Sequence, residues 1–172
     1  MNSRGPFAAR TRRPPAAWAL GTLLVGFLDG LAAVLVVGAT AGVGPDRIFQ
    51  SIAAGALGRD ALTGGLTTAL VGVGLHFVIA GSVTAIYMVA SRWLVPLRRH
   101  PLVCGPLYGI GVYVVMNLVV LPLSAIGAPG RLTLAAAATG VPIHIVCVGL
   151  PIAIVASRVI WSDEAASAIG ET

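Results

Sequence analysis

Four long apolar stretches constrain this chain more than any other feature of its sequence. Each holds about twenty residues, enough for a helix to cross the roughly 30 Å hydrocarbon core of a bilayer. Backbone groups inside a bilayer have no water to bind, so spanning segments satisfy their own hydrogen bonds as helices. The sequence therefore predicts an all-α integral membrane four-helix bundle. The spans are expected at about residues 18–40, 66–89, 102–123 and 132–157.

The composition agrees with lipid as the main solvent. Apolar residues make up 57% of the 172 residues and charged residues only 10%, against about a quarter charged in soluble domains. All eleven basic residues are arginine, and they lie beside the spans without the aromatic interleaving or basic helix face of a nucleic-acid site. The expected partner is thus the lipid bilayer, and no nucleic acid is expected. Cys104 and Cys147 fall inside apolar stretches, where packing residues or free thiols are expected.

The arginines are divided unequally between the two sides of the predicted spans. Arg47, Arg59 and Arg131 would lie on one side. The other eight would share the opposite side: Arg4, Arg10, Arg12, Arg13, Arg92, Arg98, Arg99 and Arg158. Because basic residues concentrate on the cytoplasmic side of membrane proteins, both termini are predicted to be cytoplasmic. They would form tails over residues 1–17 and 159–172.

A short amphipathic helix is predicted over residues 46–58, between the first two spans. Gly44-Pro45-Asp46 is a helix-start signal. Apolar residues then recur at helical spacing on one face: Ile48, Phe49, Ile52, Ala53, Ala56 and Leu57. Polar side chains such as Gln50 and Ser51 lie elsewhere on this helix. It is expected either to lie in the outer membrane interface or to pack as a lid over the bundle.

An internal repeat links the second and fourth spans. GVGLHFVIAG (Gly72–Gly81) returns as GVPIHIVCVG (Gly140–Gly149), with five of ten positions identical, the histidine included. The repeat predicts a tandem duplication of a helical hairpin, about an axis along the membrane normal. Small residues at Gly26 and Gly30, and the pair Gly105-xxx-Gly109, predict close contact between helix backbones.

One strongly polar side chain falls within each span: Asp29, His76, Asn117 and His144. Counting along each helix places them near the membrane midplane, with Asn117 about a turn nearer the outside. A carboxylate in hydrocarbon is costly, so Asp29 is expected to face inward and to meet a histidine. These four residues are the candidate polar core.

Three interpretations of the polar core are open. Asp29 and Asn117 could hydrogen-bond the two histidines and so join the helices. The titratable side chains could instead form a proton or ion pathway. Alternatively, His76 and His144 could be the two axial ligands of a haem or bind a metal.

The function predicted from these residues is non-enzymatic, because no HExxH, GxSxG or nucleotide motif occurs. We expect a small transport or channel subunit that forms homo-oligomers or belongs to a membrane complex. The alternatives are a bis-His haem or metal-binding redox protein and a purely structural membrane scaffold. No particular cofactor is predicted.

Several runs of sequence resemble an uncharacterised family of small four-helix inner-membrane proteins of bacteria. They are Pro45–Ala53 (PDRIFQSIA), Leu75–Phe77 (LHF), Ala90–Arg92 (ASR) and Met116–Ser124 (MNLVVLPLS). The resemblance covers most of residues 18–158. It implies a location in the bacterial inner membrane, and it implies no activity and no functional residues.

Overall fold

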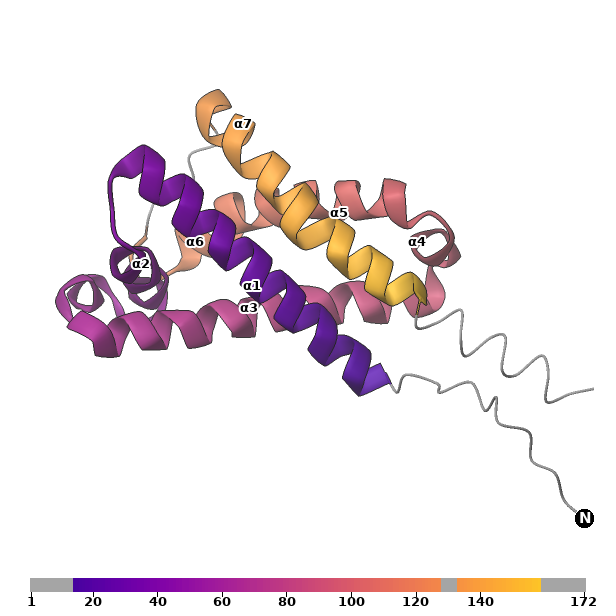
Figure 1. Ribbon diagram of the computed structural model, residues 1–172, viewed down its shortest axis with the longest axis horizontal. Coiled ribbons are helices and arrows are strands. Elements are labelled where there is room, and N and C mark those ends of the chain that lie inside the picture. Colours follow the sequence, from indigo (N-terminus) through magenta and orange to yellow (C-terminus); the bar gives the residue numbers. More distant parts are fainter. Residues whose placement is uncertain (1–13, 128–132, 159–172) are drawn as a thin grey trace, which may run out of the picture.

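The computed structural model describes residues 14–127 and 133–158, and these residues are almost entirely helical (Figure 1). They include no strand, so the predicted all-α fold class is confirmed. The helices that begin the four spans are α1 (Pro14–Ala41), α3 (Gly65–Trp93), α5 (Pro101–Val115) and α7 (Leu134–Ile143). The other elements are α2 (Pro45–Leu57), the 3₁₀ turn η1 (Arg59–Thr63), α4 (Val95–Arg99) and α6 (Leu121–Leu123).

Two π-helical segments extend the later helices. α5 continues through η2 (Met116–Val120) into α6, and α7 continues through η3 (His144–Gly149) into helix that reaches Arg158. Of the predicted tails, residues 1–13 and 159–172 lie outside the described residues, whereas residues 14–17 already belong to α1.

Four of the resulting helices are long and apolar enough to cross a membrane. They run over Pro15–Ala41, Gly65–Trp93, Pro101–Leu123 and Leu134–Arg158. Large apolar side chains point outward along them, with Phe27 67% exposed and Leu102 71% exposed. Such a surface would be unfavourable in water and suits a lipid environment.

The four spans pack as two hairpins. α1 packs against α3, and α5 packs against the helix that contains η3. Figure 1 shows α1 crossing α3 and the last helix crossing α5, with the described start of α1 and the end at Arg158 at the same end of the molecule. The two hairpins meet around a core of small and aliphatic side chains together with Tyr87, which is fully buried.

Glycines allow the close helix contacts that the sequence predicts. A Cβ atom on Gly149 would overlap the backbone of Gly105, and one on Gly109 would overlap the carbonyl group of His144. In the first hairpin, a Cβ atom on Gly26 would overlap the ring of Phe77. Helices in lipid associate by this kind of close packing, because lipid is as apolar as the helix surfaces and the hydrophobic effect does not drive the helices together.

Both π-helical segments lie close to prolines. Pro122 follows η2, and Pro142 and Pro151 flank η3. A proline has no N–H for the helix ladder, and a π turn is one way in which a helix accommodates the break. Spans three and four are therefore irregular near their prolines, and the irregularity takes the form of π turns.

The predicted amphipathic helix is present as α2, and it packs along the first half of α3. The fit is tight, because a Cβ atom on Gly72 would overlap the backbone of Phe49. On its other side, the N–H of Ala125 donates to the carbonyl oxygen of Gly55 at 2.8 Å. α2 therefore bridges the chain segments that follow α6 and precede α3, at the end of the bundle away from the two described chain ends.

The buried face of α2 differs from the predicted one. Ile48 and Ala53 are buried as expected, but Gln50 is buried as well, with 4% of its surface exposed, and Leu57 is 57% exposed. The reason is a specific bond: the Gln50 amide nitrogen donates to the carbonyl oxygen of Gly65 at 3.0 Å. Hydropathy alone does not reveal that a polar side chain is needed at this contact.

Candidate functional site: a polar cavity within the bundle

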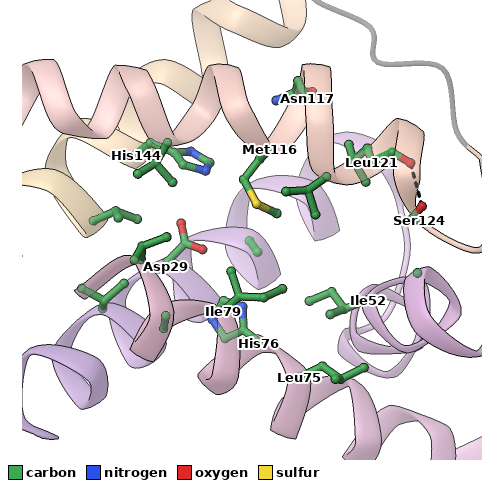
Figure 2. Close-up of a pocket in the computed structure, with 18 of the residues that line it drawn as sticks. Asp29, Ile52, Leu75, His76, Ile79, Met116, Asn117, Leu121, Ser124 and His144 are labelled. Atoms are coloured by element: carbon green, nitrogen blue, oxygen red, sulfur yellow. Dashed lines mark hydrogen bonds between the residues drawn. The ribbon is translucent and has the colours of Figure 1, made fainter. Parts of the chain in front are cut away.

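A cavity of about 460 Å³ lies between α1, α2, α3, the α5–η2–α6 helix and η3 (Figure 2). This volume is within the range of about 300–1,000 Å³ that is typical of small-molecule sites. Its lining is mostly aliphatic. The polar side chains in it are Asp29, Ser51, His76, Asn117, Ser124 and His144. The structure therefore brings all four residues of the candidate polar core to one cavity.

His76 projects from the middle of α3 and is buried, with 9% of its surface exposed. Its Nε2 lies 3.0 Å from the carbonyl oxygen of Gly26 on α1. A carbonyl oxygen only accepts, so this nitrogen carries the hydrogen and Nδ1 of the neutral ring keeps a lone pair. The ring also makes edge contacts with Phe49 and Phe77, with centroid distances of 6.1 and 5.9 Å. His76 is thus a fixed connection between α3 and α1.

His144 is the first residue of η3 and is half-buried. Its Nδ1 lies 2.9 Å from the carbonyl oxygen of Gly140, one turn earlier in the same helix. By the same argument Nδ1 carries the hydrogen, and Nε2 of the neutral ring is an acceptor. The ring packs edge-on against Tyr113 of α5, at a centroid distance of 5.3 Å. The two histidines of the repeat therefore have different partners.

The interpretation in which Asp29 and Asn117 bond the two histidines is wrong. Asn117 donates instead to the carbonyl oxygen of Tyr113, four residues earlier, at 2.9 Å. Both histidines bond backbone carbonyls. The physical reason is proximity, because the carbonyl one turn back is always within reach of a polar side chain on a helix. The polar bond that does join two helices is the one between His76 and Gly26.

Asp29 has no hydrogen-bond or ion-pair partner among residues 14–127 and 133–158. Figure 2 shows it between the two histidines, with its carboxylate directed across the cavity toward His144. It faces inward as expected, but it bonds neither ring. A carboxylate in an apolar setting costs several kcal/mol unless it gains a proton or a positive partner. Asp29 is the one acidic side chain among the described residues that line the cavity.

Two cavity residues were missed in the sequence. Ser51 of α2 and Ser124 after α6 line the cavity, and their hydroxyls donate to the carbonyl oxygens of Ile48 and Leu121, each at 2.6 Å. Ser51 was expected away from the apolar face of its helix. The available signal is the spacing Ser51-xxx-Gly55, which is a small-residue pair of the kind that marks helix contacts.

A metal site gains no support within the part of the chain that the structure describes. These residues hold no group of three histidine, cysteine, aspartate or glutamate side chains that could bind a metal ion. Cys104 and Cys147 are free thiols, as the sequence allowed.

Four apolar helices of spanning length, around a mostly aliphatic cavity that contains a few polar side chains, fit a multi-pass α-helical membrane protein. No protein-family model matches the chain, and no curated protein or solved structure that was compared with it matches. The resemblance noted in the sequence therefore stays a prediction, and the function has to be argued from the cavity.

Proposed function

We propose that this chain is a small transport protein whose cavity carries protons by way of Asp29 and can instead take up a cargo there. The observation that carries the proposal is an unpartnered carboxylate in a cavity of about 460 Å³ inside the spans, beside two histidines. Ionisable side chains at membrane depth are costly and occur mainly on ion, proton or substrate pathways. No catalytic role is proposed for any residue.

The proposed location is the bacterial inner membrane, with both termini in the cytoplasm and with the protein acting as a homo-oligomer or a subunit of a larger complex. The arginine distribution supports this orientation. Arg92, Arg99 and Arg158 belong to the same end of the bundle as the described start of α1, whereas Arg47 and Arg59 belong to the α2 end. Labelling of single cysteines at Arg99 and Arg59 in intact cells with a membrane-impermeant reagent tests the orientation, since only the Arg59→Cys variant should react.

A flux assay tests the proposed function. The purified protein is reconstituted into liposomes that contain a pH-sensitive dye, and a potassium gradient with valinomycin sets the membrane potential. We expect faster proton entry than in protein-free liposomes, and we expect Asp29→Asn to lower it to the protein-free rate. Asp60→Asn is the matched control, because Asp60 is an exposed aspartate outside the spans.

The outcomes separate the remaining alternatives. Equal flux in the original protein, the Asp29→Asn variant and protein-free liposomes would contradict the proton pathway and favour a structural scaffold. A Soret band or stoichiometric metal in the same purified sample, lost in His76→Ala and His144→Ala, would favour the redox protein instead.

A further inference from the structure

The hydrogen-bond donors of the cavity are already used. His76 donates through Nε2 to Gly26, and His144 donates through Nδ1 to Gly140. The hydroxyls of Ser51 and Ser124 donate to carbonyl oxygens of their own helices. Among the described residues that line the cavity, one amide hydrogen of Asn117 is the donor left over.

The acceptors of the cavity remain available. Both carboxylate oxygens of Asp29 lack a partner among the described residues, and each neutral imidazole keeps the lone pair of its second nitrogen, Nδ1 in His76 and Nε2 in His144. A ligand that matches this pattern must supply N–H or O–H donors. It must also carry a positive charge, because the half-buried carboxylate of Asp29 lies in a mostly aliphatic cavity and is stabilised by a cationic partner.

The other residues that line the cavity determine which chemical group the uncharged part of the ligand must be. They are mainly aliphatic, among them Leu75, Ile79, Val83, Val112, Val120 and Val148. Such a lining binds hydrocarbon. Asp29, His76 and His144 do not make a metal site, because the described residues hold no group of three histidine, cysteine, aspartate or glutamate side chains that could bind a metal ion. An anion would meet acceptors and a negative charge, so the cavity favours neither a metal ion nor an organic acid.

We propose that the cargo of this cavity is a protonated organic amine with an apolar body, held by its N–H groups on Asp29. This inference rests on the proposed function and names its substrate class. The exchange step balances without another reactant. The Asp29 carboxylic acid loses its proton to water, and the resulting carboxylate then pairs with the ammonium group. Proton and ammonium compete for one carboxylate, so they occupy the site in turn.

A matched ligand series tests the proposal on the unchanged protein. The four probes share a phenylbutyl body and differ only in the head group: 4-phenylbutylamine, its N,N,N-trimethylammonium derivative, 4-phenylbutanol and 5-phenylpentanoic acid. Binding to the detergent-purified protein is measured by calorimetry. We expect the amine to bind at least about tenfold more tightly than the other three, as a charge-assisted hydrogen bond is worth about that much. The trimethylammonium probe has the charge but no N–H, so it isolates the hydrogen bond.

Variants locate the binding site. Asp29→Asn should bring the affinity for the amine down to that for the alcohol, and Asp29→Glu should restore most of the difference. Asp60→Asn should bind all four probes as the original protein does. Because the ligand series needs no variant, the test holds even where Asp29→Asn fails to fold.

The results distinguish this proposal from the one on which it rests. Equal affinity for the amine and the alcohol, tighter binding of the acid, or an Asp29→Asn variant that folds and keeps the affinity for the amine would each overturn the amine assignment. Asp29-dependent proton flux in those cases would leave the transport function standing. Selective amine binding without any flux would instead retain the ligand class and remove transport.

Discussion

His76 Nε2 lies 3.0 Å from the carbonyl oxygen of Gly26 and joins the middle of α3 to α1, whereas its repeat partner His144 bonds only its own helix. Loss of the two side chains should therefore have different effects. His76→Ala removes an interhelical bond and leaves a void at a buried position, so we expect a loss of about 1–3 kcal/mol in stability. We expect less than about 1 kcal/mol for His144→Ala.

Thermal unfolding in one detergent compares these two variants with His100→Ala. His100 is exposed at the start of α5 and should leave the unfolding temperature unchanged. Equal losses for His76→Ala and His144→Ala would show that the two bonds have equivalent roles, against the structure.

A pair of glycines on α5 tests how closely the second hairpin packs. Gly109→Ala places a methyl group against the carbonyl of His144, whereas Gly111→Ala meets nothing within 4 Å. Overpacking of this kind costs about 1–3 kcal/mol. Gly111→Ala removes a flexible residue from a helix and should be neutral or slightly stabilising. The difference in unfolding temperature between the two variants is the measurement, and the same response in both would contradict the contact.

The position of α2 over the cavity can be tested with a cross-link. A Cβ atom on Gly55 would lie 3.8 Å from Cβ of Ser124, the mean separation of about 3.8 Å found in disulfides. We expect Gly55→Cys with Ser124→Cys, in a background with Cys104→Ser and Cys147→Ser, to oxidise readily and to slow amine binding and proton flux.

Reduction of this cross-link should restore the original rates, and each single cysteine variant serves as the control. Full activity of the oxidised double variant would show that movement of α2 away from α6 is not required for access to the cavity.

The sequence predicts how far along its helix a residue lies better than which side of the helix it faces. Span length and hydropathy suffice for the four long helices, and counting along them predicts a shared layer for Asp29, His76 and His144. The acceptors Gly26 and Gly140 could not be predicted, since every residue offers a carbonyl oxygen. The burial of Gln50 was missed because hydropathy favours outward placement of polar groups. Whether the layer binds a cargo stays a prediction.

The two hairpins run in the same direction through the bundle, and this limits how the cavity can open to both faces. In inverted repeats, exchange of conformations between the halves turns an inward-facing site into an outward-facing one. In a parallel repeat the same exchange leaves the opening on the same face. Under the proposed transport function, access to the opposite face then requires an asymmetric movement. α2 is suited to it, because it belongs to the first hairpin alone and only the ten residues 124–133 lie between the two spans of the second hairpin.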